Sequence, residues 1–111
     1  MKKTVKELAE LCQWKIWNQA DSEKIGSGVY CGDLLSWVMA KCKEGDVWLT
    51  IMTNGNVGAV AELSSCAAVV LCESQEPDEI LTEKAKKHGI NLYGSSLSVY
   101  ETAVKIHEAE S

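Results

Sequence analysis

Short apolar runs alternate with helical patterns along most of this chain, and this alternation constrains its fold more than any other feature. Three such runs, at residues 47–52, 67–72 and 90–93, are each followed by a polar loop and then by apolar residues at helical spacing. Strands that are apolar on both faces belong to parallel sheets covered by helices. The sequence therefore predicts an α/β fold, a single three-layer domain with a mainly parallel sheet of βα repeats flanked by helices.

Residue types at the expected helix starts support this division. Asp33 stands where it would cap a helix over residues 34–42, and Asn56 stands where it would cap a helix over residues 57–63. The strand between these helices, residues 47–52, carries the strongest signal for burial. We therefore expect that strand to lie centrally in the sheet.

The second half of the chain continues the pattern. Pro77 fits the first turn of a helix that ends at Gly89, a residue type common just beyond helix C-termini. A capping box at residues 98–101, Ser-Val-Tyr-Glu, opens a final helix. A short strand is also predicted at residues 29–31, so each of these four helices follows a predicted strand, as repeated βα units require.

The first 27 residues precede these repeats. A capping box at residues 4–7 predicts a helix with Val5, Leu8 and Leu11 as its apolar face. A strand over residues 13–18 follows, and then a polar, glycine-bearing loop to residue 28. We expect one domain over residues 1–111, made of this N-terminal helix, strand and loop (1–27) and the βα core (28–111).

The charge balance excludes some partners. The 111 residues carry a formal net charge of −5, and all 11 basic residues are lysines. An acidic chain of this kind lacks the basic patch that nucleic-acid phosphates require. The longest wholly apolar run, residues 67–72, is far too short to span a bilayer. We therefore expect neither a nucleic acid nor a membrane as a partner.

The cysteines form an odd set without CxxC spacing, and we expect them to be small buried hydrophobes in a reducing cytoplasm. They are Cys12, Cys31, Cys42, Cys66 and Cys72. His88 and His107 share no ligand-like spacing with these thiols. We therefore expect no metal site and no cofactor.

Polar residues that follow the predicted strands are candidate ligand contacts. They are Thr53, Asn54 and Asn56 after one strand, and Ser95, Ser96 and Ser98 after the last. Parallel sheets bind ligands outside the carboxyl ends of their strands, and helix N-termini there suit anions. The alternative is that Asn56, Ser96 and Ser98 serve only as caps and turn residues. Capping accounts less well for Thr53 and Asn54, because Asn56 is already the expected cap.

Two tryptophans receive different predictions. Trp48 lies in a predicted buried strand and is expected in the core. Trp37 lies on a predicted helix, rotated away from its apolar row, which favours exposure. An exposed tryptophan is typical of an interface, although isolated surface tryptophans also occur without one. Both interpretations of Trp37 stay open.

Catalytic motifs are missing from the sequence. It contains no legible pair of nucleophile and base, no metal-ligand cluster and no GxxxxGK[ST] phosphate loop. We therefore expect no catalytic residues and a protein that is not an enzyme.

Four segments between Gly28 and Ile106 occur in the order and at the spacing of a known family. They are GVYCGDLLSWVMAKCKEGDVWLTIMTNGNVGAVAEL, AAVVL, EPDE and GINLYGSSLSVYETA. This part of the chain resembles the DRTGG-domain family. The resemblance implies a small regulatory or dimerising α/β domain, similar to the non-catalytic N-terminal domain of HPr kinase/phosphorylase. Similar domains stand beside CBS domains in some pyrophosphatases and occur in some phosphotransacetylases. Stand-alone relatives accompany iron-hydrogenase and redox proteins of anaerobic bacteria.

The chain departs from that family at the motif that names it. Residues 23–28, Glu-Lys-Ile-Gly-Ser-Gly, stand where the family has Asp-Arg-Thr-Gly-Gly, so only the glycine character remains. A kinase of this family would carry its phosphate loop in a separate catalytic domain. The resemblance therefore implies no kinase activity for this chain.

Two functions follow from these observations. The first is a non-enzymatic regulatory domain, a homodimer that senses a small polar or anionic metabolite. The alternative is an interaction module that docks on a hydrogenase or another redox enzyme. A ligand sensor should have a concave polar site at the loop edge, whereas a docking module should have a flat apolar patch there or around Trp37.

Overall fold

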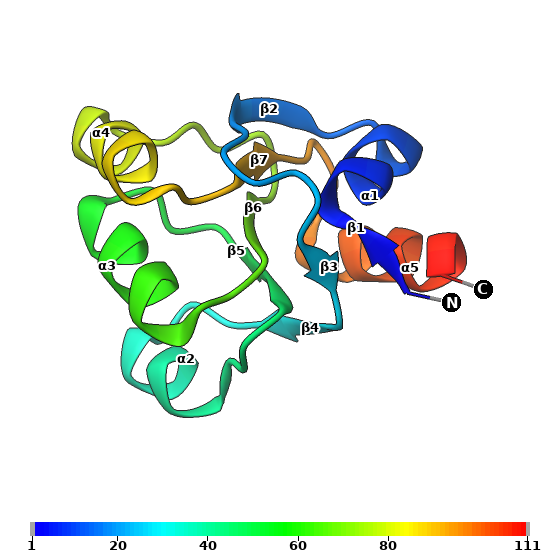
Figure 1. Ribbon diagram of the computed structural model, residues 1–111, viewed down its shortest axis with the longest axis horizontal. Helices are drawn as coiled ribbons and strands as arrows, with labels where there is room; N and C mark the ends of the chain where they lie inside the picture. The colour runs from blue at the N-terminus through cyan, green and yellow to red at the C-terminus, as the bar shows by residue number, and fades with distance from the viewer. Residues whose placement is uncertain (1, 111) are drawn as a thin grey trace.

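A five-stranded sheet with helices on both faces forms the body of the molecule (Figure 1). The computed structural model describes residues 2–110. The elements, in chain order, are β1 (Lys3–Thr4), α1 (Val5–Cys12), β2 (Lys15–Asn18), β3 (Ile25–Gly26), β4 (Gly28–Cys31), α2 (Leu35–Lys41), β5 (Asp46–Thr50), α3 (Gly55–Ser64), β6 (Ala68–Leu71), α4 (Glu79–His88), β7 (Leu92–Gly94) and α5 (Val99–Glu110).

The strand order of the main sheet is β2-β7-β6-β5-β4. Strands β4, β5, β6 and β7 are parallel, and only β2 runs antiparallel, with Lys15 opposite Gly94. A small antiparallel pair, β1 with β3, lies apart from this sheet. The prediction of a mainly parallel sheet is confirmed.

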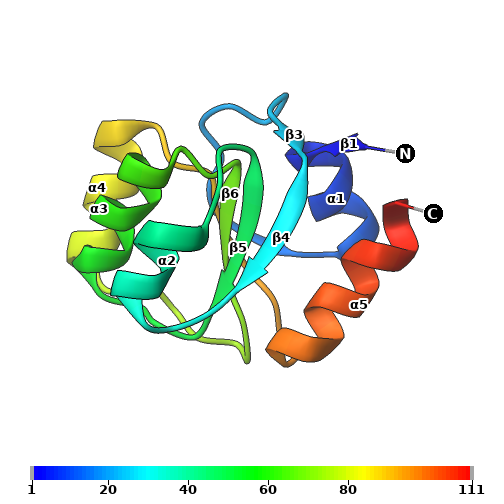
Figure 2. The same cartoon turned by 90° about the horizontal axis from the view of Figure 1, so that it is seen from below.

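The helices divide into two layers around the sheet (Figure 2). Alternate side chains of β5 point to opposite faces, as strand geometry requires. Trp48 packs in the cluster that α2, α3 and α4 form on one face, whereas Val47 and Leu49 pack in the cluster of α1 and α5 on the other. The predicted three-layer arrangement is therefore present, and both faces of β5 are buried.

The middle strand is β6 rather than β5. The predicted strand at residues 47–52 corresponds to β5, an interior strand between β4 and β6 that lies next to the middle one and ends at Thr50. All four residues of β6 are buried. The loops that converge at the middle of the carboxyl edge are consequently those after β6 and β7.

Asn54, and not Asn56, caps helix α3. The Asn54 side-chain oxygen accepts a hydrogen bond from the Asn56 backbone N–H at 2.9 Å, and the helix begins at Gly55. The Asn56 side chain is exposed and makes no hydrogen bond within the described part of the chain. The prediction of the cap was wrong because three adjacent residues, Asn-Gly-Asn, offer two equivalent cap side chains.

Replacing Asn54 by alanine is expected to lower the free energy of unfolding by about 1 kcal/mol, because the first turn of α3 loses its side-chain acceptor. Urea denaturation followed by far-UV circular dichroism measures this loss. Asn56→Ala is the matched control and should change stability by less than about 0.5 kcal/mol. Equal losses in the two variants would contradict the assignment of the cap.

Two other predicted helix starts also differ from the structure. Helix α2 has Leu34 at its N-cap without a side-chain cap, and the Asp33 carboxylate instead accepts hydrogen bonds from Thr50 Oγ1 (2.7 Å) and the Ile51 N–H (3.1 Å). Asp33 thus joins the β4–α2 connection to the end of β5, and local sequence does not predict this long-range contact. Pro77 precedes the helix rather than opening it, because Asp78 is the N-cap of α4.

Helix α1 begins at the predicted capping box, in which the Glu7 N–H donates to Thr4 Oγ1 at 3.1 Å. Its buried face contains Val5 and Leu8, as predicted, together with Ala9. Leu11 is 59% exposed, so its assignment to the apolar face is wrong. Side chains spaced by three and four residues share one face of a helix, and Leu11 lies beside that stripe.

Candidate functional site

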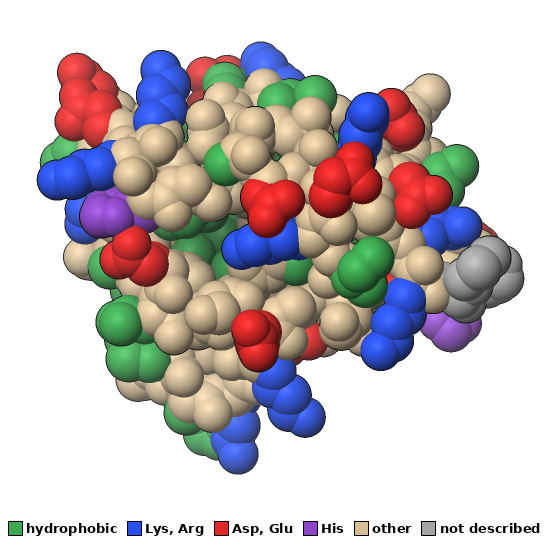
Figure 3. All heavy atoms as spheres, viewed as in Figure 1, with side chains coloured by type: hydrophobic (Ala, Val, Ile, Leu, Met, Phe, Trp, Pro, Cys, Tyr) green, Lys and Arg blue, Asp and Glu red, His purple; other side chains and the backbone are tan. Residues whose placement is uncertain are grey.

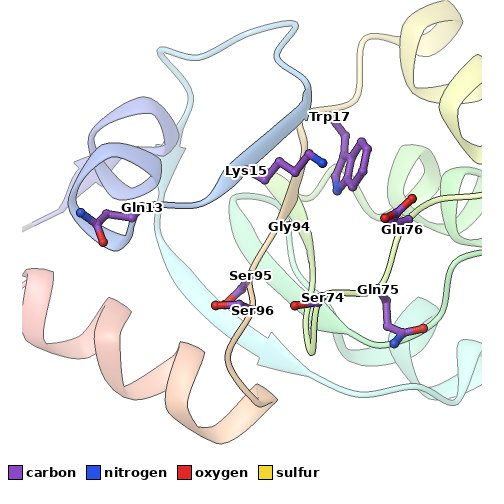
Figure 4. A pocket seen from close by; sticks show the side chains of 9 residues that line it. All are labelled: Gln13, Lys15, Trp17, Ser74, Gln75, Glu76, Gly94, Ser95 and Ser96. Carbon is purple, nitrogen blue, oxygen red and sulfur yellow. The ribbon is translucent and has the colours of Figure 1, made fainter.

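A polar hollow of about 270 Å³ opens at the carboxyl edge of the sheet (Figure 4). Its walls are the end of β7, the β6–α4 loop, the start of β2 and the C-cap of α1. The lining residues are Gln13, Lys15, Trp17, Ser74, Gln75, Glu76, Gly94, Ser95 and Ser96. The hollow therefore combines the carboxyl ends of two central strands with the N-terminal part of the chain.

The antiparallel strand β2 brings three of these residues to the hollow. Gln13 ends α1 in the left-handed conformation (φ 57°) and turns the chain into β2. Lys15 then pairs with Gly94, the last residue of β7. Because β2 runs against β7, its first residues lie where the parallel strands end, which places Lys15 at this edge.

The β6–α4 loop has an unusual backbone. Glu73 and Ser74 both have positive φ, 59° and 58°, which costs energy for residues other than glycine. Two hydrogen bonds hold them there: the Glu73 N–H donates to the Leu97 carbonyl (2.8 Å) and the Ser74 N–H donates to the Ser95 carbonyl (2.9 Å). The loops after β6 and β7 therefore form one connected wall of the hollow.

Most polar side chains around the hollow form no hydrogen bond or salt bridge with another described residue. Those that make no hydrogen bond or salt bridge within residues 2–110 belong to Gln13, Lys15, Ser74, Glu76 and Ser96. The buried Ser95 hydroxyl is different, because it bonds Thr102 Oγ1 at 2.9 Å and accepts from the Leu97 N–H at 3.1 Å. Ser95 thus supports the wall, while the other side chains are available to a ligand.

Trp17 and Lys15 stack on each other. Lys15 Nζ lies 4.1 Å from the centre of the Trp17 ring, a cation–π contact. A Cβ at Gly94 would be only 2.8 Å from Trp17 Nε1, so the indole edge rests against β7 where the side chain is smallest. Trp17 Nε1 is also the one buried side-chain polar atom of the described residues that has no hydrogen-bond partner.

The structure places only two of the six predicted site residues in the hollow. Ser95 and Ser96 line the hollow, whereas Thr53, Asn54, Asn56 and Ser98 do not. Thr53 and its neighbours lie at the same edge, on the far side of the β6–α4 connection, where the Asp78 N–H donates to the Thr53 carbonyl at 2.9 Å. The Ser98 hydroxyl accepts from the Glu101 N–H at 3.1 Å, which confirms the second capping box.

Gln13, Lys15 and Trp17 were not among the predicted site residues. Their position depends on the pairing of β2 with β7, which joins residues separated by most of the chain. The available signal was the predicted strand at residues 13–18, which has no crossover helix of its own and must join an edge of the sheet.

The glycines of residues 23–28 lie at the opposite, amino edge. A Cβ at Gly26 would be 3.0 Å from Leu8 Cδ1, and one at Gly28 would be 2.7 Å from Asp46 Oδ1. Gly28 begins β4 opposite Asp46, the first residue of β5. These glycines therefore allow close packing of the chain, and they take no part in the hollow.

Three of the five cysteines are buried as predicted, whereas Cys12 is half-buried and Cys31 is exposed, which corrects the prediction for these two. Cys42, Cys66 and Cys72 are buried, but Cys31 is exposed because β4 is an edge strand. Burial raises the pKa of the Cys66 thiol to about 12, so this thiol stays protonated at neutral pH. Among residues 2–110, no group of three or more His, Cys, Asp or Glu side chains could hold a metal ion.

Surface charge is mixed on the face drawn in Figure 3, where lysines lie among acidic side chains. In the part of the chain that the structure describes, no helix has the length and apolar character needed to cross a membrane. Trp37 and Trp48 differ as predicted: Trp37 is 59% exposed on α2, and Trp48 is fully buried.

No protein-family model and no curated protein matches the sequence. A solved structure shares its fold: the crystal structure of the CBS and DRTGG domains of the regulatory region of Clostridium perfringens pyrophosphatase, complexed with its activator diadenosine tetraphosphate. The TM-score is 0.81 at 14% identity, over 96% of this chain and 47% of the other. This chain thus spans about half the length of that structure, and the likeness confirms the predicted fold.

Proposed function

We propose that this chain is a cytoplasmic, DRTGG-like regulatory domain that binds a small polar or anionic metabolite in the hollow beside Lys15. The observation that carries the proposal is the set of unpartnered polar side chains around a concave site at the carboxyl edge of the sheet. Ligands of parallel sheets bind at this edge. The shared fold with a regulatory region and the sequence resemblance to DRTGG domains, including that of HPr kinase/phosphorylase, support the same function.

A binding role accounts for the hollow better than catalysis does. Its hydroxyl groups, on Ser74, Ser95 and Ser96, have no histidine among the lining residues to act as a base. His88 Nδ1 lies 2.7 Å from Glu62 Oε2, and neither residue lines the hollow. The proposal therefore includes neither a catalytic residue nor a cofactor.

Size and charge argue for a ligand smaller than diadenosine tetraphosphate, the activator bound by the structural neighbour. A hollow of about 270 Å³ is at the lower end of small-molecule sites. One lysine and no arginine line it, so four linked phosphates would find few cationic partners. The neighbour supports small-molecule sensing in general, and the ligand of this chain is proposed to be different.

Thermal unfolding against a panel of metabolites tests this function. The panel contains the standard amino acids, short mono- and dicarboxylates, inorganic phosphate, AMP, ATP and diadenosine tetraphosphate. A compound present at about 100 times its Kd should raise the melting temperature by about 10 °C. No shift with any member would contradict the proposal.

Lys15→Gln is expected to weaken the affinity of the compound found in this way by about tenfold, because the hollow loses its only cation. Isothermal titration calorimetry measures the change. Lys41→Gln, at an exposed lysine in the last turn of α2, is the matched control and should bind as the wild type does. Equal binding by Lys15→Gln and the wild type would place the site elsewhere.

The alternative function is a docking module for a hydrogenase or another redox enzyme, and the exposed side chains of helix α2 favour it. Leu34, the N-cap, is 61% exposed and Trp37 is 59% exposed, and side chains three residues apart lie on one side of a helix. We propose that this face is the interface of a homodimer. Sedimentation equilibrium tests this: a mass of two chains that Trp37→Ser reduces to one supports the homodimer, and a monomeric wild type leaves the face to another protein.

A further inference from the structure

The hollow contains two side chains of opposite charge that do not pair. Lys15 and Glu76 both line it, yet the salt bridge formed within residues 2–110 joins His88 and Glu62 elsewhere. Neither Lys15 nor Glu76 makes a side-chain hydrogen bond to another described residue. Both side chains are exposed, so each charge is open to solvent and to a ligand.

The indole of Trp17 positions the Lys15 ammonium group in the hollow. Lys15 Nζ is held 4.1 Å from the ring centre, and in Figure 4 the Lys15 and Glu76 side chains flank the ring on opposite sides. The ring rests against Gly94, where any side chain would collide with it. The Lys15 ammonium group stacks on this indole, and neither it nor the Glu76 carboxylate forms a salt bridge within residues 2–110.

A ligand that carries only negative charge fits this arrangement poorly. Both nearby helix N-termini are already occupied: the Leu81 N–H donates to the Asp78 carboxylate (2.8 Å) and the Ser98 N–H donates to the Glu101 carboxylate (3.2 Å). A phosphate dianion would meet one lysine and be repelled by Glu76. A ligand with one negative and one positive group would have a partner of opposite charge for each.

We propose that the hollow binds a zwitterion of amino-acid size, with its carboxylate on Lys15 and its ammonium group on Glu76. This inference rests on the proposed function and specifies the class of ligand. The hydroxyls of Ser74 and Ser96 and the Gln13 amide are neutral partners for the rest of the molecule. The volume of about 270 Å³ admits a molecule of this size.

Calorimetric titration with charge-blocked ligands tests the inference. Each standard amino acid is titrated, and the tightest binder is compared with its C-terminal amide and its N-acetyl derivative. Each blocked form lacks one charge and should bind about tenfold more weakly or worse. Equal binding by an amino acid and both of its blocked forms would overturn the inference.

Two variants assign the charges to their partners. Lys15→Gln should weaken the binding of the free amino acid. It should change the binding of the amide very little, because the amide has already lost the carboxylate. Glu76→Gln should likewise weaken the binding of the free amino acid but leave the binding of its N-acetyl derivative nearly unchanged. Lys41→Gln and Glu83→Gln, at exposed positions away from the hollow, are the controls and should behave as the wild type.

The outcomes separate this inference from the proposed function. Suppose that a carboxylate without an ammonium group binds, that Lys15→Gln weakens its binding and that Glu76→Gln does not. The hollow is then a ligand site, but the zwitterion inference is wrong. If no amino acid, carboxylate or phosphate in the panel binds, both proposals are wrong.

Discussion

Trp48→Ala is expected to lower the free energy of unfolding by about 3–5 kcal/mol, because it removes the largest fully buried side chain of the core. Trp48 lies in β5 and packs in the cluster formed with α2 and α3. Its Nε1–H also donates to the Gly32 carbonyl at 2.9 Å. The alanine variant therefore leaves both a cavity and an unpaired acceptor.

Urea denaturation followed by circular dichroism and near-UV signals measures this loss. Trp48→Phe is the informative control, since it keeps an aromatic ring but removes the hydrogen bond to Gly32, and it should lose only about 1–2 kcal/mol. Trp37→Ala, at an exposed tryptophan, should lower the free energy of unfolding of the monomer by less than Trp48→Ala or Trp48→Phe does. If Trp48→Ala lost no more than Trp37→Ala, the description of the core would be wrong.

Asn91→Ala is expected to lower the free energy of unfolding by about 2–4 kcal/mol, because this side chain makes four hydrogen bonds. Asn91 is 2% exposed. Its oxygen accepts from the backbone N–H groups of Ala20 (2.8 Å) and Asp21 (2.9 Å), and its nitrogen donates to the carbonyls of Asp21 (2.8 Å) and Ala67 (3.0 Å). The alanine variant leaves all four backbone groups without these partners.

Amide hydrogen exchange adds a local measurement to the change in unfolding free energy. The Ala20 and Asp21 amides should lose their protection first in Asn91→Ala, because their acceptor is gone. Asn56→Ala, which removes an exposed asparagine, is the control and should leave both quantities near those of the wild type. Unchanged exchange at residues 20 and 21 would show that Asn91 does not hold this connection.

The local signals in the sequence predicted the architecture well, and the reason is that each acts over a few residues. The capping boxes at Thr4 and Ser98 join residues three apart, and Gly89 ends its helix in the left-handed conformation. Strands that are apolar on both faces require cover on both sides, which leads to three layers. Asn54 and Asn56 mark the limit of this approach, since an asparagine at either position could cap the helix equally well.

The sequence by itself thus determined that apolar strands alternate with helices and that the sheet is covered on both faces. Only the tertiary structure decided that β2 pairs with β7, that β6 is central, and that Asn91 ties the connection after β2 to the sheet. The pairing of Lys15 with Gly94 creates the hollow and depends on the register between distant strands. Such a register is set by long-range packing of whole elements, which no local pattern of residues records.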